Sequence, residues 1–398
     1  MDLERAPPHR RRGGDGVSNG NKSVPASAPL PCRSGIAGIE EDLDQTEALQ
    51  FRGRCLPYVR AARHLRGILG GPDRVTSIAA ALERVWAQRE FHIYFSRPFL
   101  LLAALRAEAL ASAAHPLARG FATHEPDMSA VTREALVAAL SPEYIGLWVA
   151  LATRSPQTNE VSRAVVWKWP AELAGLSRRT RPLALVDVGA SGGLNLIGDR
   201  FDDGWTDGGG LPLRVVSDVD VCLRIGFDLR PLDFLVEQDV AWGRACLWPG
   251  ADERAARFER AVDEWRKSSQ LKARPIVHKL NAALVPGRLA DILAKVPEKA
   301  VLFIYQTLVA EYMDRAKRKQ YEDGMRRWLA PLPPRRAVWV EAESAPDRPS
   351  GTVGIDAHLP DGSGGIRTIN LGWTSVHPTS VHGRLAGAKE FTEYFATT

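Results

Sequence analysis

Three glycines follow a short apolar segment near the middle of the chain. Leu183–Val188 is nearly all apolar, which predicts a strand buried on both faces, and glycines stand at positions 189, 192 and 193. Glycine lets the backbone turn tightly and lets a ligand approach the peptide groups. If a helix begins near Gly193, its free N–H groups point into the same space. The segment therefore predicts a cradle for a nucleotide-like ligand, or else a tight turn of an ordinary parallel sheet.

An acidic residue after a second apolar segment could complete this cradle. Residues 224–228 predict a strand that ends at Asp228, where a carboxylate could accept hydrogen bonds from both hydroxyls of a ribose. If the strand ended earlier, Asp218 or Asp220 would take that place. Asp228 could also cap a helix ahead of Pro231. We expect Asp228 to bind the ligand, with the other two acids as alternatives.

A dense polar segment precedes the glycine-containing strand. Thr158 or Asn159 could cap the next helix, with Glu160 favourable in its first turn. Asn159 and Arg163 are four residues apart, so on a helix they would share one face. Such a cluster could line a cleft above the glycines. We expect Gln157, Asn159 and Arg163 to contact a substrate and Glu160 to take part in catalysis.

Polar residues also follow the buried strand predicted at 300–304. In open α/β sheets, ligands lie outside the carboxyl ends of the strands, so Tyr305 and Gln306 are candidates for catalysis. Gln306 could orient a nucleophile. A polar turn between a strand and a helix would explain the same residues. Glu311 and Tyr312 follow about one helical turn later, and none of the four is a self-evident general base.

The order of the predicted elements indicates an α/β protein with a helical N-terminal domain. Residues 1–41 are rich in Gly, Pro, Ser and Arg and are expected to be disordered. Residues 42–176 are expected to form a helical domain over the site, and residues 177–398 a doubly wound, Rossmann-like, mostly parallel sheet. Helices are predicted from apolar spacing at Thr76–Trp86, 99–111, 132–140, 142–152 (with Ile145 buried) and Asp252–Lys267.

The composition limits the classes of partner. The chain has 398 residues, 45% of them hydrophobic, and a net charge of +5 to which Arg10, Arg11 and Arg12 contribute. That excess is mild for a nucleic-acid-binding protein. The four cysteines form no CxxC pair, and no cluster of His, Cys and Asp indicates a metal site. No apolar run is long enough to span a membrane. We expect a cytoplasmic protein that binds small molecules, and the sequence leaves its oligomeric state open.

The glycine segment also matches a hydrolase pattern. Gly189-Ala-Ser191-Gly-Gly193 has the letters Gly-x-Ser-x-Gly, which place a nucleophilic serine between a strand and a helix in α/β-hydrolases. His377 or His382 would then have to supply the base. The hypothesis is a serine hydrolase with Ser191 as its nucleophile.

Several longer motifs resemble one bacterial family. They occur in the order 157–161, 183–195 with 199–200, 226–233, and 248–249 ahead of 253–254. Together they resemble an uncharacterised bacterial family known only as domain of unknown function 2332, over roughly residues 51–398. That resemblance implies no established activity.

The core of that family in turn resembles class I S-adenosylmethionine-dependent methyltransferases. Their first motif is an acidic residue followed by x-Gly-x-x-x-Gly, which Asp187 to Gly193 fit, whereas Ser191 departs from the dinucleotide pattern G-x-G-x-x-G. The resemblance implies that Asp228 binds the ribose and that Asn281 replaces the acid that commonly reads the adenine amine. It implies that the cofactor is held by Asp187, Gly189, Ala190, Ser191, Gly192, Gly193 and Asn195.

Three functions remain open from the sequence. The favoured one is an S-adenosylmethionine-binding methyltransferase that acts on an unknown acceptor. In that case we expect Gly189→Val to abolish cofactor binding in a protein that stays folded. The alternatives are a non-catalytic regulator of the same fold and the Ser191 hydrolase.

Overall fold

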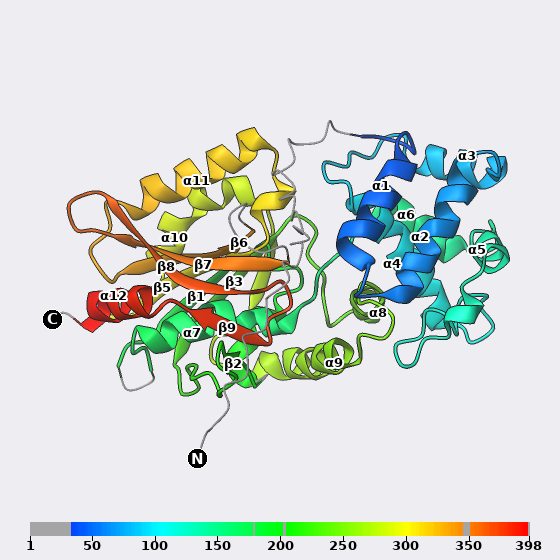
Figure 1. Cartoon of the computed structure of the whole chain (residues 1–398). Helices are drawn as coiled ribbons and strands as arrows, with labels where there is room; N and C mark the ends of the chain where they lie inside the picture. The colour runs from blue at the N-terminus through cyan, green and yellow to red at the C-terminus, as the bar shows by residue number, and fades with distance from the viewer. Residues whose placement is uncertain (1–32, 178–179, 202–203, 345–350, 397–398) are drawn as a thin grey trace, which may run out of the picture.

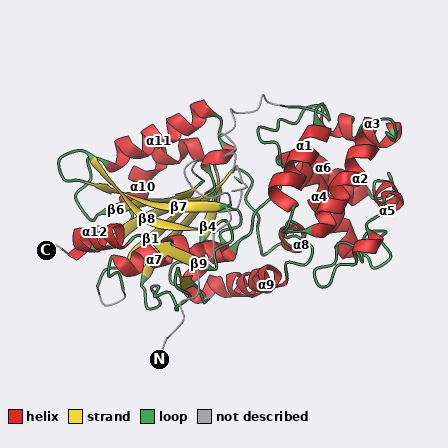
Figure 2. Ribbon diagram, viewed as in Figure 1, coloured by secondary structure: helices red, strands yellow, loops and turns green. Residues whose placement is uncertain are grey.

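The computed structural model describes residues 33–177, 180–201, 204–344 and 351–396, and it has a helical part beside an α/β part (Figures 1 and 2). Most of the segment expected to be disordered lies outside the described residues. Its last residues do not fit that expectation. Arg33 pairs with Phe91 in a β-bridge, and Ile36 and Ile39 are buried. These two isoleucines anchor the segment to the helical core, which its overall composition did not indicate.

The helical part has a single apolar core, to which Leu65, Trp86 and Leu101 contribute fully buried side chains. The Thr132 hydroxyl caps a helix by accepting a hydrogen bond from the N–H of Ala135. The helices are α1 (Ile39–Thr46), α2 (Leu56–Leu69), α3 (Thr76–Trp86), α4 (Ser96–Ala111), α5 (Arg133–Ala139) and α6 (Ile145–Thr153), with short turns η1 (Glu47–Phe51) and η2 (Met128–Ala130). The prediction of a buried Ile145 is wrong, because α6 packs through Leu147 and Leu151 and leaves Ile145 71% exposed.

The α/β part is built on one nine-stranded, mostly parallel sheet, which confirms the predicted class. The sheet order is β2-β9-β8-β7-β6-β5-β1-β3-β4, and the strands β4, β3, β1, β5 and β6 run parallel to one another. The strands from β6 to β9 form an antiparallel meander. The strands are β1 (Leu183–Val188), β2 (Thr206–Asp207), β3 (Val221–Asp228), β4 (Ile276–Lys279), β5 (Val301–Thr307), β6 (Ala337–Glu343), β7 (Thr352–Pro360), β8 (Ile366–Ser375) and β9 (Ser380–Gly383).

The position of β1 locates the ligand-binding edge. The strand β3 lies on one side of β1, and β5 lies on the other. The connection after β1 leads to β3 on one side, whereas the connection after β5 leads to β6 on the other, so the loops at the carboxyl ends of β1 and β5 diverge. Such a switch point opens a crevice in parallel α/β sheets.

Helices cover both faces of the sheet (Figure 1). The helices α10 (Leu289–Leu293) and α11 (Arg315–Leu329), with the turn η6 (Ala282–Arg288), pack on one face, and α7 (Val165–Leu173) and α12 (Leu385–Ala396) on the other. Alternate residues of β1 face the two layers, as its wholly buried pattern requires. The predicted boundary at 176 placed α7 in the helical domain, but its apolar residues are buried against the sheet.

Two helices between β3 and β4 join the two parts of the molecule. These are α8 (Glu237–Ala245) and α9 (Asp252–Lys267), and α9 has the predicted bounds. Trp242 and Phe258 share a core cluster with the helical part. The buried guanidinium of Arg106 on α4 donates to the carbonyls of Arg244 and Leu247 at 2.6 and 2.8 Å. The helical part is therefore anchored to the loop that follows β3.

The glycine loop leads into a seven-residue 3-10 helix, η4 (Leu194–Arg200), whose N-cap is Gly193. The carbonyls of this segment bond to buried cations from other elements. Lys168 donates to the carbonyl of Gly198 at 2.9 Å, and Arg224 donates to the carbonyl of Leu196. These contacts replace the bonds that a longer helix would make to its own backbone. Other short turns are η3 (Val161–Ala164), η5 (Ser268–Gln270) and η7 (Ala310–Tyr312).

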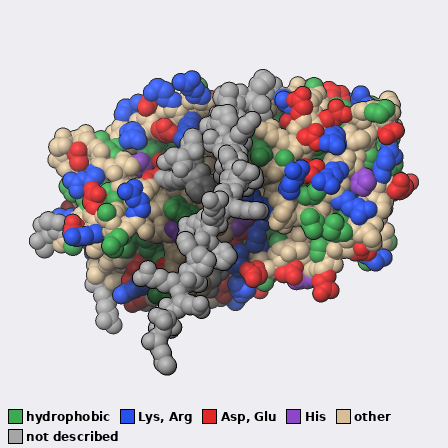
Figure 3. All heavy atoms as spheres, in the orientation of Figure 1, with side chains coloured by type: hydrophobic (Ala, Val, Ile, Leu, Met, Phe, Trp, Pro, Cys, Tyr) green, Lys and Arg blue, Asp and Glu red, His purple; other side chains and the backbone are tan. Residues whose placement is uncertain are grey.

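Three basic side chains of α11, those of Lys317, Arg318 and Lys319, pair with acids of the same region. Figure 3 shows Lys and Arg side chains gathered along this helix. Arg318 lies 2.7 Å from Glu322, and Lys319 lies 2.8 Å from Asp323. This spacing of opposite charges is typical of a solvated helix face.

Among the residues that the structure describes, no helix combines the length and apolar character needed to cross a membrane.

Candidate active site

A cavity of about 610 Å³ lies between the carboxyl edge of the sheet and the helical part. Small-molecule sites typically enclose roughly 300–1,000 Å³. The predicted site residues Gln157, Arg163, Gly189, Ser191, Asp228 and Asn281 line it. The helical part contributes its opposite wall, so both parts of the molecule build the cavity.

The glycines of the loop are required mainly by packing. A Cβ atom at Gly192 would lie 2.1 Å from the ring of Phe234, and one at Gly193 would lie 2.8 Å from Val277. Gly189 has a φ of 79°, and its Cβ would lie 2.4 Å from Val309. Gly189→Val would therefore strain the loop, so a loss of binding in this variant would not separate a role in cofactor binding from a role in packing. Only Gly189 and Ser191 of this loop border the cavity, whereas Ala190, Gly192, Gly193 and Asn195 support it from behind.

Asp228 ends β3 beside the glycine loop, while Asp218 and Asp220 precede that strand and so lie at its opposite end. One carboxylate oxygen of Asp228 accepts the N–H of Ser191 at 2.8 Å, and the other accepts the N–H of Arg230 at 2.7 Å. Each oxygen keeps a further lone pair. Burial raises the pKa of Asp228, and the two backbone hydrogen bonds oppose that shift.

Ser191 has no histidine partner within the described part of the chain. Its hydroxyl donates to Oδ1 of Asn159 at 2.7 Å. Nδ1 of His377 lies 2.9 Å from Glu160, and the ring of His382 stacks on Trp373 with centroids 3.8 Å apart. A serine nucleophile needs a base within hydrogen-bond reach, so this geometry does not support the hydrolase hypothesis.

Glu160 forms the centre of a buried charge cluster. Its carboxylate lies 2.8 Å from Arg254, 3.4 Å from Arg257 and 2.9 Å from His377. Burial alone would raise the pKa of Glu160, but His377 and the two arginines hold it well below its ordinary value. Glu160 does not line the cavity. A carboxylate that stays ionised and lies outside the cavity is not suited to proton transfer, so the structure does not support its predicted catalytic role.

The backbone around Glu160 also differs from the prediction. Glu160 itself, and not Thr158 or Asn159, is the N-cap of η3, and its side chain accepts from the N–H of Ser162. Asn159 precedes the helix and so does not share a helical face with Arg163. Asn159 still contributes to the site, because it holds the hydroxyl of Ser191.

Tyr305, Gln306 and Asp187 are core residues in the structure. The strand β5 continues to Thr307, past its predicted end, so Tyr305 and Gln306 are 1% exposed and lie outside the cavity lining. Oε1 of Gln306 accepts from Tyr321 and from Trp339, and its Nε2 donates to Glu343 at 2.8 Å. The Tyr305 hydroxyl lies beside Asp187, and burial raises the pKa of both groups well above their ordinary values. The predicted catalytic roles of Tyr305 and Gln306 are not supported.

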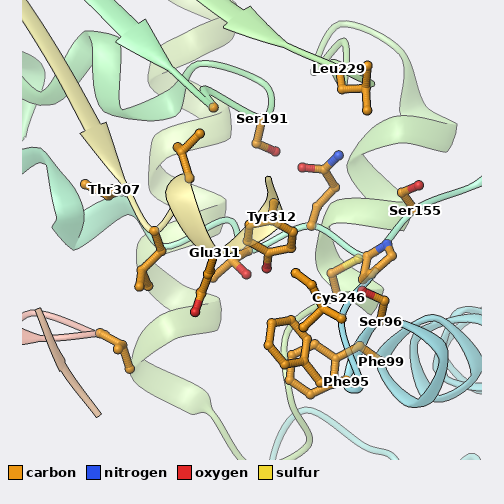
Figure 4. Close-up of a pocket in the computed structure, with 18 of the residues that line it drawn as sticks. Phe95, Ser96, Phe99, Ser155, Ser191, Leu229, Cys246, Thr307, Glu311 and Tyr312 are labelled. Carbon is orange, nitrogen blue, oxygen red and sulfur yellow. The ribbon is translucent and has the colours of Figure 1, made fainter. Parts of the chain in front are cut away.

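Glu311, which was not among the predicted catalytic residues, stands in the cavity (Figure 4). Its loop follows β5 and contains Leu308 with a φ of 55°. The carboxylate of Glu343 holds the loop by accepting the N–H groups of Val309 at 2.9 Å and Ala310 at 3.2 Å. The side chain of Glu311 is exposed to the cavity, yet desolvation by the surrounding protein raises its pKa to about 7, and the nearby charge of Arg163 opposes the shift. A carboxyl group with this pKa can act as a general base near neutral pH.

Arg163 brings a buried positive charge to the same cavity. The residue is 8% exposed, and its Nε donates to the carbonyl of Val376 at 3.1 Å. In the described part of the chain, the terminal nitrogens of its guanidinium make no hydrogen bond or ion pair. Its charge influences both Glu311 and Tyr312.

Aromatic rings form the wall of the cavity that faces the sheet edge. Phe95 and Phe99 come from the helical part, with centroids 5.1 Å apart, and Tyr312 meets Phe95 edge-on at 6.0 Å. Trp248 meets Phe99 at 6.1 Å. Figure 4 shows Phe95 and Phe99 grouped with Tyr312 on one side of the cavity. The site thus joins an aromatic wall to a polar one.

A family model with the description "Uncharacterized protein conserved in bacteria (DUF2332)" matches residues 65–382. The chain belongs to this family. The resemblance to this bacterial family is thereby confirmed over those residues. No curated protein and no solved structure matches the chain.

The DUF2332 match covers most of the cavity. Arg163, Asp228 and Glu311 lie inside the matched range, as do Phe95 and Phe99. Both walls therefore belong to the family region. Within the described ranges, no group of three or more His, Cys, Asp or Glu side chains could hold a metal ion.

Proposed function

We propose that this protein is an S-adenosylmethionine-dependent methyltransferase that acts on a small molecule. One observation carries the proposal: Asp228 at the end of β3 adjoins the loop after β1, and both border a cavity at the switch point of the sheet. In doubly wound sheets an acid at this place accepts hydrogen bonds from ribose hydroxyls. The order β4-β3-β1-β5-β6 resembles the core of class I methyltransferases, whereas the antiparallel meander beyond β6 is a feature of this chain.

The residues of the cavity fit the parts of the cofactor. Each oxygen of Asp228 has a lone pair left for a ribose hydroxyl. The loop borders the cavity through Gly189 and Ser191, whose N–H groups already donate to the carbonyl of Phe227 and to Asp228, so it would contact the methionine portion without offering it free N–H groups. Oδ1 of Asn281 already accepts the N–H of Ala283 at 3.0 Å, so its amide is better suited to donate to a ring nitrogen of adenine. The bound cofactor would supply an activated methyl group.

The chain's own contribution to the reaction would be enclosure, orientation and one base. The helical part forms one wall of the cavity and would cover one side of a bound ligand. Placement of the acceptor in line with the methyl group supplies much of the rate enhancement in such reactions. Glu311, with a pKa of about 7, would accept the proton of the acceptor's O–H or N–H group.

Titration calorimetry with S-adenosylmethionine and S-adenosylhomocysteine tests the cofactor site. We expect micromolar binding that Asp228→Asn weakens by roughly tenfold or more, since hydrogen bonds to a charged group contribute about 1.5–3 kcal/mol. Asp220→Asn is the matched control, because this acid lies at the opposite end of β3 and is not in the cavity lining. Absence of heat with both ligands, from protein with the circular dichroism of a folded chain, refutes the proposal. Equal effects of the two substitutions refute the assignment of Asp228.

A further inference from the structure

The charged groups of the cavity restrict which acceptor it can hold. Arg163 presents terminal guanidinium nitrogens that have no partner in the described residues, although the residue is 8% exposed. Among the other cations at the cavity, Arg254 pairs with Glu160 and Arg89 donates to the carbonyls of Leu151 and Arg154, whereas Arg54 is exposed and so is not a buried charge. A buried charge without a partner is costly in an empty site. Arg163 therefore favours an anionic group on the ligand.

The acidic residues of the cavity limit the charge that this anion can carry. Glu311 and Asp228 line the same space as Arg163. A dianionic phosphate would meet repulsion from both, whereas an ammonium group would meet Arg163. A carboxylate carries a single charge and has the planar, two-oxygen shape that a guanidinium binds through parallel hydrogen bonds. The balance of charges thus points to a monocarboxylate.

The aromatic wall defines the remainder of the ligand. Phe95, Phe99 and Trp248 line the cavity in a continuous series of ring contacts between 5.1 and 6.1 Å. Tyr312 is 46% exposed within the cavity and carries this surface towards Glu311. Rings stack edge-to-face or offset on such walls with a gain beyond the burial of area. A planar aromatic body fits this wall better than a flexible polar one.

We propose that the acceptor is an aromatic carboxylic acid with an O–H or N–H group, whose carboxylate binds Arg163 and whose ring lies on the aromatic wall. The identity of the reaction rests on the proposed methyltransferase function, but the binding of the acid does not. In the reaction, the carboxylate of Glu311 takes the proton from the acceptor oxygen or nitrogen. That atom forms a bond to the methyl carbon while the carbon–sulfur bond breaks. The electron pair stays on sulfur, S-adenosylhomocysteine leaves, and Glu311 returns the proton to solvent.

Titration calorimetry with three ligands tests the carboxylate site. They share a 4-hydroxyphenyl ring and differ in charge: the anion 4-hydroxyphenylacetate, the neutral amide 4-hydroxyphenylacetamide and the cation tyramine. We expect the acid to bind at least about tenfold more tightly than the amide, and tyramine to bind most weakly. Arg163→Gln should remove the advantage of the acid and leave the amide within about threefold of its wild-type affinity. Arg163→Lys keeps the charge but loses the paired hydrogen bonds, so we expect an intermediate loss for the acid. The lysine variant decides the test if the glutamine variant does not fold.

A second arm assigns the carboxylate to acceptor or cofactor. S-adenosylhomocysteine also carries a carboxylate, so it is titrated into the same variants. If Arg163→Gln weakens S-adenosylhomocysteine and spares 4-hydroxyphenylacetate, Arg163 serves the cofactor and the inference is overturned. Equal binding of the three probes to the wild type overturns it as well. Binding of the acid by a protein that binds neither S-adenosyl compound would support this site and refute the proposed function.

The role of Glu311 is tested by its amide variant. With the acid and S-adenosylmethionine present, release of S-adenosylhomocysteine should fall about 100-fold or more in Glu311→Gln, while binding of the acid is retained. The wild-type rate should rise with pH through the pKa of about 7, and the residual rate of the variant should not show that step. Full activity in the variant would overturn the assignment of the base.

Discussion

Replacing Glu160 with Gln should lower the free energy of unfolding more than replacing an exposed charged residue does. Glu160 is 2% exposed, and its partners Arg254 and Arg257 have side chains only 13% and 12% exposed. Gln keeps an oxygen that can cap η3 but removes the charge that both arginines face. Breaking a buried ion pair from one side costs about 3–5 kcal/mol, because the other charge stays buried and unpaired. We therefore expect the free energy of unfolding of Glu160→Gln to fall by about 3–5 kcal/mol.

Urea denaturation at pH 7, followed by far-UV circular dichroism and tryptophan fluorescence, measures this loss. The matched control is Glu253→Gln, since Glu253 also pairs with Arg257, at 3.8 Å, but its side chain is 87% exposed. Exposed pairs contribute about 0–1 kcal/mol, so the control should differ little from the wild type. A loss below about 1 kcal/mol for Glu160→Gln would refute the reasoning, because the cluster would then not depend on its central charge.

Three further predictions concern stability. Gly192→Ala should destabilise the protein by about 1–3 kcal/mol in urea denaturation because its Cβ would meet the buried ring of Phe234, whereas Gly287→Ala, with no atom nearby, should be near neutral. Burial lowers the pKa of His377 from 6.5 to about 4, with Arg254 adding to the effect. Between pH 6.5 and 4 the unfolded chain therefore binds a proton that the folded chain does not. The free energy of unfolding should fall by up to about 3 kcal/mol as the pH is lowered through this range, and it should fall less in His377→Gln. Glu343→Ala should cost about 1–3 kcal/mol by leaving two loop N–H groups unpaired, and Glu343→Gln should cost less because its oxygen can still accept them.

Local patterns were sufficient to predict much of the fold. The bounds of α3, α9 and β1 follow the predicted ranges, because apolar spacing, acids in a first turn and an all-apolar run depend only on neighbouring residues. The end of β3 at Asp228 was predicted on the same basis. The pairing of β6 to β9 into an antiparallel meander was not predicted, since strand pairing leaves a weaker local signal than the strands themselves.

The errors at the site have a common cause. Tyr305 and Gln306 were predicted to be reactive because polar residues at a strand end usually face the ligand. The structure instead gives Gln306 partners on other elements, Tyr321, Trp339 and Glu343. Glu160 was chosen for its polar neighbours, but its true partners are Arg254 and Arg257, almost a hundred residues away in the chain. A buried polar residue cannot be distinguished from a catalytic one until its hydrogen-bond partners are known.

Glu311 shows why the chemistry of this protein depends on both of its parts. On the sheet alone, the loop after β5 would face water, and a carboxyl group there would titrate near its ordinary value. The rings of Phe95 and Phe99 come from α4 and its N-cap, and they close the cavity opposite that loop. Desolvation in this cavity raises the pKa of Glu311 to about 7, and Arg163 is buried there with its terminal nitrogens directed at no protein partner among the described residues. The helical part therefore acts as more than a cover, because it creates the electrostatic environment in which Glu311 and Arg163 can act on a ligand.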